Sequence, residues 1–352
     1  MPIPRPLAVI RMARLGAVLT ACGLLLAGTG TRPGATALEE PAIPLRVHIG
    51  RPSTIPFDSP SGLVILTARI NGRSQVRLLL DTGDPSGFTL DTRIARELGL
   101  PLDSRTATRA TGVVGSQRFN LYRARVGSFL LGGLSARDFS IWTAPDALLI
   151  GKTLGIRVDG FVGVDLLRGL TVTLDYPARQ ITFAPPAAGE AIPPAPGGSQ
   201  GASPEPAGAQ PDSGGLAGVP LRLEGNRIVV DALLNGTETR AMVVDTAAGT
   251  TFIAEGDLAL TRPSPKGATT QIVDSSGGAV SVSLRILPSL AFGGAVARDV
   301  AVVPYDFEAL KQGLFAGTPH AVSGILGSDL LSRHVVVLDF PRRTLRIDPK
   351  RP

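Results

Sequence analysis

Cysteine is almost absent from this chain of 352 residues, since Cys22 is the only one. It lies inside an N-terminal stretch that has the features of an export signal. Arg5, Arg11 and Arg14 precede the apolar run from Leu15 to Ala27, and Ala35-Thr36-Ala37 is a small-x-small cleavage site. We therefore expect residues 1–37 to be a signal peptide. A chain cut at Ala37 has no cysteine, which excludes disulfides, thiolate catalysis and cysteine-based metal sites.

Long hydrophobic runs are lacking too, and the apolar run in the predicted signal peptide, the leader, is too short to cross a membrane. Leu19-Thr20-Ala21-Cys22 matches a lipobox, so lipidation of Cys22 is the less favoured alternative. The expected location is periplasmic or secreted.

Charge and histidine are also scarce. Removal of residues 1–37 takes away four arginines and no acidic residue, so the formal net charge of +6 falls to +2. No block of basic residues interleaved with aromatics is left to suggest nucleic-acid binding. His48, His320 and His334 share no metal-ligand spacing. We expect no cofactor and no metal.

What the chain does have is a repeat. LLLDTGDPSGFTL around Asp81 recurs as MVVDTAAGTTFIA around Asp245, 164 residues later. Seventy-nine residues after each aspartate a second matched pair begins, GFVGVDLL from Gly160 and GILGSDLL from Gly324. The unit is a whole domain of about 140 residues, so the pattern indicates a gene duplication.

Between the two copies, residues 185–218 are almost entirely Pro, Ala, Gly, Ser and Gln. Such a composition cannot bury enough apolar surface to become ordered, and it predicts a flexible tether. The predicted lobes are residues 45–184 and 219–348.

Within each lobe the pattern predicts mainly strands. The turns Asn71-Gly72 and Asn235-Gly236 each separate two apolar runs and predict matching hairpins. The one clear helix begins after Asp91 and ends before Gly99. The fold class is therefore all-β with short helices and internal pseudo-symmetry.

The repeated motifs resemble those of the aspartic peptidases, specifically bacterial relatives of the retroviral-type enzymes, joined in tandem as in the pepsin-like ones. The resemblance rests on an apolar strand that ends in Asp81-Thr82-Gly83, its variant Asp245-Thr246-Ala247, and two downstream triplets. The triplets are Phe161-Val162-Gly163 and Ile325-Leu326-Gly327. The resemblance covers nearly the whole chain outside the leader and linker, and it implies two β-barrel lobes with an active-site cleft between them.

The same resemblance implies that Asp81 and Asp245 are the catalytic pair. Two adjacent carboxylates share one proton, so the pair serves as general base and general acid together. Thr82 and Thr246 would hydrogen-bond across the pseudo-twofold axis. The backbone N–H of Gly83 would bind the carboxylate of Asp81.

We call the two turns at residues 81–83 and 245–247 the first and second elbow. Between each elbow and its downstream triplet lies a hairpin candidate with a polar tip that could cover substrate. The residues concerned are Thr111, Gly112, Ser275, Ser276 and Gly277. The repeated acids Asp165 and Asp329 suit a helix cap or first turn, and Asp175 and Asp339 suit strand-end turns.

Two departures from the pattern leave the function open. Ala247 replaces a glycine, so its methyl group could crowd the pair of aspartates, Asp81 and Asp245, here called the dyad. It could also exclude a backbone conformation with positive φ. Asp84 adds a carboxylate directly after Gly83, where it could raise the pKa of the pair or simply point to solvent.

Three hypotheses follow. The leading one is an exported endopeptidase that acts on peptides or proteins, as a monomer with an intramolecular pseudo-dimer. The main rival is an inactive pseudopeptidase that binds peptide or cell-wall material. In the third, lobe 1 pairs with lobe 1 of a second chain.

Overall fold

A computed structural model gives the three-dimensional structure. It describes residues 18–21, 25–26, 42–72, 74–111, 118–145, 150–152, 155–186, 218–274, 279–307 and 322–348. Most of the predicted linker, residues 187–217, lies outside these ranges, and the lobe boundaries given above stay predictions.

Lobe 1 is a closed barrel of six strands, in which β8 pairs with both β4 and β9 and so completes the ring. Its strands are β4 (Ile65–Ile70), β5 (Ser74–Leu80), β6 (Phe88–Asp91), β8 (Arg118–Leu131), β9 (Leu134–Ala144) and β10 (Gly160–Val162). β7 (Leu102–Thr111) pairs with β8 outside the ring, and the short helices of this lobe include η1 (Pro60–Gly62), α1 (Thr92–Glu97) and η2 (Val164–Leu166).

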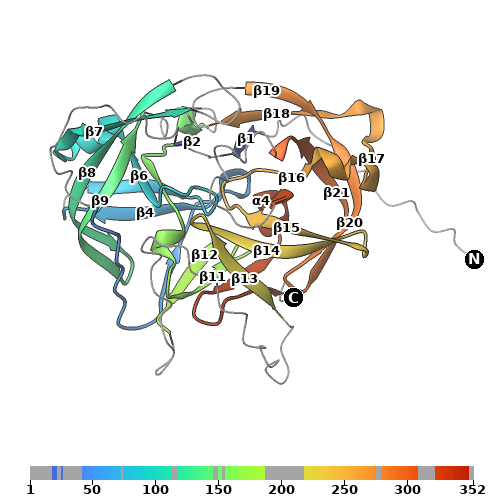
Figure 1. Ribbon diagram of the computed structural model, residues 1–352. Helices are drawn as coiled ribbons and strands as arrows, with labels where there is room; N and C mark the ends of the chain where they lie inside the picture. The colour runs from blue at the N-terminus through green and yellow to red at the C-terminus, as the bar shows by residue number, and fades with distance from the viewer. Residues whose placement is uncertain are drawn as a thin grey trace, which may run out of the picture.

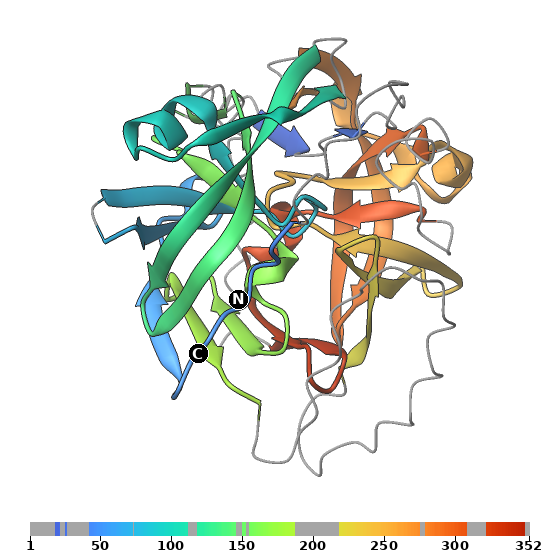
Figure 2. The same cartoon turned by 60° about the vertical axis from the view of Figure 1, so that its left-hand side comes forward.

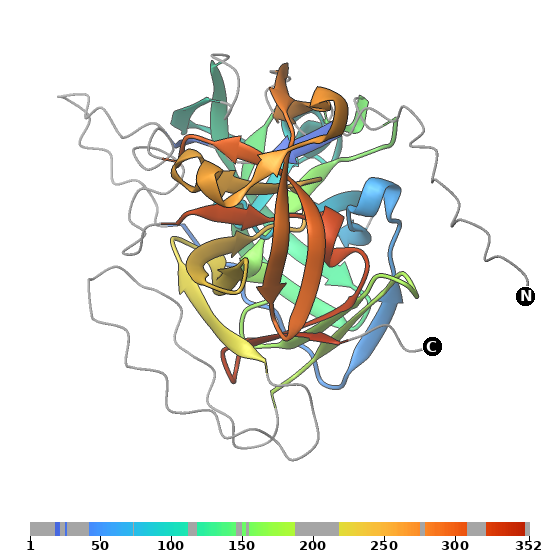
Figure 3. The ribbon, with the colours of Figure 1, turned by 90° about the vertical axis from the view of Figure 1, so that its right-hand side faces the viewer.

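Lobe 2 repeats this ring, and the pairing of β20 with β14 closes it. Its strands are β14 (Arg227–Leu234), β15 (Glu238–Val244), β16 (Thr251–Ala254), β20 (Arg285–Phe292), β21 (Ala295–Tyr305) and β22 (Gly324–Leu326). The remaining elements are β17 (Arg262–Pro263), the hairpin β18 (Thr269–Asp274) and β19 (Ala279–Ser283), η3 (Glu255–Leu260), η4 (Pro265–Gly267) and α4 (Ser328–Leu331). Figure 3 shows this lobe with its long β20–β21 hairpin toward the viewer.

The sequence-predicted hairpins are present at equivalent places in both rings. Asn71 and Gly72 have φ of 50° and 68°, and Asn235 and Gly236 have φ of 51° and 74°. Asparagine and glycine tolerate this left-handed region, which two-residue hairpin turns require. The predicted helix is confirmed as α1, whose N-cap Asp91 accepts a hydrogen bond from the backbone N–H of Arg93.

A sheet built from both lobes joins the barrels on one side of the molecule (Figures 1 and 2). Its strands in order are β13 (Val219–Glu224), β24 (Thr344–Asp348), β23 (Val335–Asp339), β11 (Thr171–Asp175), β12 (Gln180–Ala184) and β3 (Ser53–Pro56). β11 of lobe 1 pairs antiparallel with β23 of lobe 2, and Thr173 faces Val337 at the centre. The equivalent strands of the two copies thus meet on the pseudo-twofold axis.

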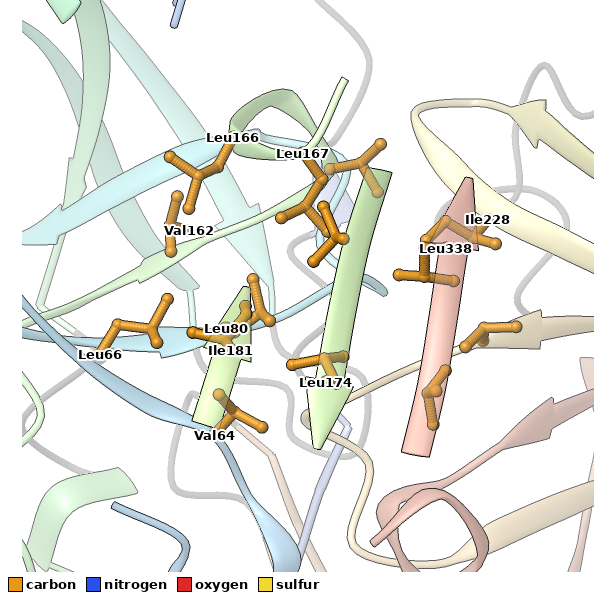
Figure 4. Packing of buried hydrophobic residues seen from close by; sticks show 14 of the residues in the cluster. Val64, Leu66, Leu80, Val162, Leu166, Leu167, Leu174, Ile181, Ile228 and Leu338 are labelled. Atoms are coloured by element: carbon orange, nitrogen blue, oxygen red, sulfur yellow. The ribbon is translucent and has the colours of Figure 1, made fainter. Parts of the chain in front are cut away.

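The two lobes share one hydrophobic core above this sheet. Leu80 and Val162 from lobe 1, Leu174 from β11, and Ile228 and Leu338 from lobe 2 belong to the same cluster and are all fully buried (Figure 4). This shared core fixes the ends of β5 and β15, where the repeated aspartates lie.

Two short strands of the predicted signal peptide lie on the opposite side of the molecule from the joining sheet. β1 (Val18–Ala21) pairs in parallel with β18, and β2 (Leu25–Leu26) pairs antiparallel with the end of β7 (Figure 1). Within the described ranges no helix is long and apolar enough to span a bilayer.

Candidate active site

The first elbow follows β5, whose last three leucines are completely buried. The backbone N–H of Asp81 donates to the carbonyl oxygen of Val162 at 2.9 Å and so continues the pairing of β5 with β10. The chain then turns, and Oδ1 of Asp81 accepts hydrogen bonds from the N–H groups of Gly83 and Asp84, both at 3.0 Å. These bonds fix the orientation of the carboxylate.

The second elbow has the same geometry after β15. The N–H of Asp245 donates to the carbonyl of Leu326 at 3.0 Å. Oδ1 of Asp245 accepts from the N–H groups of Ala247 at 2.8 Å and Ala248 at 3.0 Å. Ala247 therefore supplies the backbone donor that glycine supplies in lobe 1.

Two threonines lock the elbows together. Oγ1 of Thr82 donates to the carbonyl of Val244, and Oγ1 of Thr246 donates to the carbonyl of Leu80, each at 2.6 Å. Each hydroxyl also accepts the backbone N–H of the opposite threonine, at 3.1 Å for Thr82 and 3.3 Å for Thr246. The four crossed bonds link residues 162 to 166 positions apart, and they join the two threonines as the family resemblance implies.

The two carboxyl groups are brought together by this lock and are hydrogen-bonded to each other. Asp81 is fully buried and Asp245 is 4% exposed. Burial raises the pKa of Asp245 to about 6, although the N–H groups of Ala247 and Ala248, the charge of Arg227 and the bond from Asp81 act in the opposite direction. Asp245 therefore keeps its proton to higher pH than an exposed aspartate does.

The downstream triplets support the elbows at van der Waals distance. A Cβ on Gly163 would lie 2.8 Å from the carbonyl oxygen of Asp84 and 3.1 Å from that of Asp81. A Cβ on Gly327 would lie 2.3 Å from the carbonyl oxygen of Thr250. Only glycine permits this approach, which explains why both triplets end in it.

The structure answers the two questions that the sequence left about the elbows. Ala247 is not among the described residues with positive φ, and its buried methyl group belongs to an apolar cluster that contains Leu63, Ile65 and Phe161 of lobe 1. Asp84 does not point to solvent. It is 3% exposed and accepts hydrogen bonds from the N–H and the hydroxyl of Ser86, at 2.8 and 2.5 Å.

The described residues include only part of each predicted hairpin tip. Thr111 ends β7 and pairs with Arg118 of β8. In lobe 2, Val273 of β18 pairs with Ala279 of β19. Gly112, Ser275, Ser276 and Gly277 lie outside the described residues, so a role of these tips in substrate binding stays a prediction.

The other repeated acids have structural partners. Asp165 pairs with Arg168 at 3.0 Å, and Asp329 accepts the hydroxyl of Thr251 at 2.9 Å. Asp175 and Asp339 accept backbone N–H groups of the turns that follow them. In the part of the chain that the structure describes, no cluster of three or more His, Cys, Asp or Glu side chains could hold a metal ion.

Arg227 is a charged neighbour of the dyad that belongs to none of the repeated motifs. Arg227, the first residue of β14, is 2% exposed, and its Nε donates to the carbonyl of Gly83 at 2.9 Å. A signal does exist in the repeat, because the offset of 164 residues places Arg227 opposite Leu63 and Asp84 opposite Ala248. Each lobe thus contributes one unmatched charge next to the elbows.

Comparison with known families agrees with this geometry. A family model described as aspartyl protease matches residues 66–166 and again residues 230–330. The two matches together span more than half of the chain, and they have the same offset as the elbows. No curated protein is significantly similar to the chain in sequence.

Solved structures with a similar arrangement include an aspartic proteinase from Irpex lacteus and the basic 7S globulin from soybean. The first has 14% identity and a TM-score of 0.46, over 85% of this chain and 97% of that one. The second has 13% identity and a TM-score of 0.44, over 87% of this chain and 95% of that one.

Proposed function

The chain belongs to the aspartyl protease family, and on that premise we propose that it is an exported endopeptidase whose catalytic pair is Asp81 and Asp245. The observation that carries the proposal is the pairing of the two carboxyl groups in one chain. Both are buried, hydrogen-bonded to each other, and held by backbone donors on equivalent turns.

The protonation of the pair supplies an acid and a base at one place. Two carboxylates in contact cannot both be ionised at low energetic cost, so the pair keeps one proton over a range of pH. The raised pKa of Asp245, about 6, supports an upper end of this range at mildly acidic pH. We therefore expect activity from acidic to mildly acidic pH.

Hydrolysis then needs no further group. The ionised carboxylate takes a proton from a water molecule, whose oxygen attacks the carbonyl carbon of the peptide bond. The protonated carboxyl gives its proton to the carbonyl oxygen, which forms a tetrahedral diol. The carboxyl that took the proton of the water gives it to the amide nitrogen, and the other carboxylate takes a proton from one hydroxyl of the diol. The carbon–nitrogen bond breaks, an acid and an amine leave, and the pair returns to its starting protonation. Positioned proton transfer of this kind contributes roughly 10²–10⁴-fold to the rate.

The pairing of β1 and β2 supports an extended peptide as the substrate. These strands add to β18 of lobe 2 and to β7 of lobe 1, which belong to the two hairpins predicted to cover substrate. Strand addition of this kind gives affinity through main-chain hydrogen bonds and little dependence on sequence. We take these two pairings as support for binding of substrate by strand addition at both hairpin edges.

Export is proposed from the leader alone. Arginines before a short apolar run, followed by Ala35-Thr36-Ala37, are what a signal peptidase requires. A periplasmic or secreted enzyme follows from this, and lipidation at Cys22 is the less favoured route. Mass spectrometry of the protein from the cell envelope distinguishes a mature chain that begins at Leu38 from a lipidated one.

A second candidate function is a peptide-binding or cell-wall-binding module that does not cut. The observation that favours it is the departure of Ala247 and Asp84 from the repeated pattern. The single-chain dyad in turn argues against a site built from lobe 1 of two chains, because Asp245 already completes the pair.

Cleavage of a mixture of unstructured peptides, from acidic to neutral pH, separates these functions. We expect the wild-type protein to cut, and Asp81→Asn and Asp245→Asn each to lose cutting while they keep the wild-type circular dichroism. A peptide with a non-hydrolysable hydroxymethylene group in place of the scissile carbonyl should bind the wild type.

Other results have definite meanings. Tight binding of the mimic without any cleavage would favour the binding module. Full activity of Asp245→Asn together with an inactive Asp81→Asn would mean that lobe 1 pairs with a second chain.

A further inference from the structure

The surroundings of the two elbows differ although the elbows themselves repeat. Next to the second elbow, Ala247 lies in an apolar cluster with Leu63. At the equivalent place next to the first elbow lies Arg227, one of the largest fully buried side chains. Arginine is seldom buried without paired charges, because its removal from water is costly. This exchange of an apolar side chain for a cation needs a reason.

Arg227 binds the backbone of the first elbow. Its Nε donates to the carbonyl of Gly83 at 2.9 Å, and Nη1 donates to the carbonyl of Gly225 at 3.3 Å. The neighbouring Asn226 donates from Nδ2 to the carbonyl of Pro85 at 2.9 Å. The turn between β13 and β14 of lobe 2 therefore holds residues 83–85 of lobe 1.

Three carboxyl groups interact with the charge of Arg227. In order of strength they are Asp84, Asp245 and Asp81. Burial lowers the pKa of Arg227 to about 10, so it stays protonated at neutral pH. Asp84 and Arg227 are thus a buried acid and a buried base, one from each lobe, next to the dyad, and the charge of Arg227 favours the ionised form of Asp84.

The other titratable groups near the pair do not replace this cation. Burial raises the pKa of Asp84, and the charge of Asp165 adds to this, while the hydrogen bonds from Ser86 and the charge of Arg227 act in the opposite direction. Asp165 is itself paired with Arg168 at 3.0 Å. Tyr176 is a buried phenol whose pKa is raised by burial and by the charge of Asp245. Among the described groups, Arg227 is the cation that acts on Asp245.

We propose that Arg227 is a positioning residue of the dyad, which fixes the Gly83 turn through its hydrogen bond and stabilises the ionised carboxylate through its charge, while Asp84 balances part of that charge. This inference rests on the proposed function, since it assigns Arg227 a role in the same site. Its electrostatic part also holds for a protein that only binds peptide.

The geometry predicts opposite effects for the two partners. Arg227→Met removes the cation, so the carboxyl pair should hold its proton to higher pH and the pH profile of kcat/KM should move up by about one unit. Asp84→Ala leaves the cation unbalanced, so the profile should move down. Arg227→Lys keeps the charge but cannot copy the planar guanidinium at the Gly83 carbonyl, and it should lower kcat with little shift of the profile.

The matched control is Arg222→Met. Arg222 lies on β13, close to Arg227 in the chain, and pairs with Glu224 and Asp231. Its loss should leave the pH profile unchanged. The double variant Asp84→Ala/Arg227→Leu copies the equivalent residues Ala248 and Leu63, and its profile should lie between those of the single variants.

A readout without turnover separates this inference from the proposed function. The carboxyl carbon of Asp245 is assigned by ¹³C NMR through its absence in Asp245→Asn, and it is titrated in the wild type and in the variants. An upward shift of its midpoint in Arg227→Met and a downward shift in Asp84→Ala support the inference even if no peptide is cut.

Midpoints and profiles that coincide with those of the wild type would overturn it. If Arg227→Met does not fold, Asp84→Ala and Arg227→Lys decide the question. No shift in Asp84→Ala would then count against the charge balance, and wild-type kcat in Arg227→Lys would count against the positioning of Gly83.

Discussion

A Cβ atom on Gly83 would lie 2.3 Å from Oδ2 of Asp245, so the space of this missing side chain is filled by the carboxyl group from the other lobe. No real side chain tolerates that distance. The glycine of the first elbow therefore makes room for the carboxyl group of the second one, in addition to binding its own aspartate.

Gly83→Ala should cost about 10²-fold or more in kcat/KM, because it displaces a catalytic carboxyl by about 1 Å. The measurement is peptide cleavage at the optimum pH of the wild type. Gly256→Ala is the matched control, since a Cβ there has no atom within 4 Å and its φ is not positive. Wild-type activity of Gly83→Ala would mean that Asp245 does not need its present position.

The pH dependence of stability should report the burial of Asp245. Its pKa is raised from 3.8 to about 6 in the folded state. A group shifted in this direction contributes its full stability below pH 3.8, and the contribution is lost as the pH rises through 6. The loss amounts to roughly 3 kcal/mol.

Asp245→Asn should therefore be more stable than the wild type at neutral pH, and the difference should vanish in acid. Urea unfolding of both proteins across this range gives the difference in free energy directly. Asp329, whose pKa is also raised to about 6, is present in both proteins and cancels. Asp138→Asn, at an exposed position of β9, is the control and should show no such trend. A difference that grows toward acid pH would contradict the assignment.

The elements near the elbows could be predicted from the sequence because their causes are local. Asn71-Gly72 and Asn235-Gly236 specify tight turns by their own backbone preferences, and Asp91 caps α1 two residues from its partner Arg93. The apolar runs before Asp81 and Asp245 predict buried strands without knowledge of their neighbours.

The interactions between the lobes could not be predicted in this way. Arg227 contacts Gly83 across 144 residues, and nothing in the sequence around Arg227 marks it as a neighbour of the dyad. The pairing of β11 with β23 depends on how the two barrels dock, because each strand alone would serve equally well at an edge. The one sequence signal for the different surroundings of the two elbows is that Leu63 and Arg227 occupy equivalent positions of the repeat.

Cutting the chain between the lobes should leave the molecule in one piece. The composition of residues 185–218 predicts protease sensitivity. After cleavage there, β11 still pairs with β23, and the core around Leu80 and Leu338 still joins the lobes. Limited proteolysis followed by size-exclusion chromatography should show two fragments that elute together at the mass of the intact chain. Fragments that separate on dilution would mean that the shared sheet and core are too weak to hold the cleft.

Ala247→Gly tests whether the second elbow is strained by its methyl group. The sequence alone favours a modest gain in turnover, since Gly249 lies two residues on and could absorb the demands of the turn. The structure points the other way. The N–H of Ala247 already binds Oδ1 of Asp245 at 2.8 Å, its φ is not positive, and its methyl group is fully buried against lobe 1.

We expect Ala247→Gly to keep kcat within a few-fold of the wild type and to lose about 1–2 kcal/mol of stability, from one buried methyl group and a more flexible turn. Ala248→Gly is the matched control, because it is equally buried and its N–H also binds Asp245. Cleavage kinetics and urea unfolding of the three proteins together decide the outcome. A marked rise in kcat for Ala247→Gly alone would show that the methyl group holds Asp245 away from its best position and so lowers the turnover of the wild type.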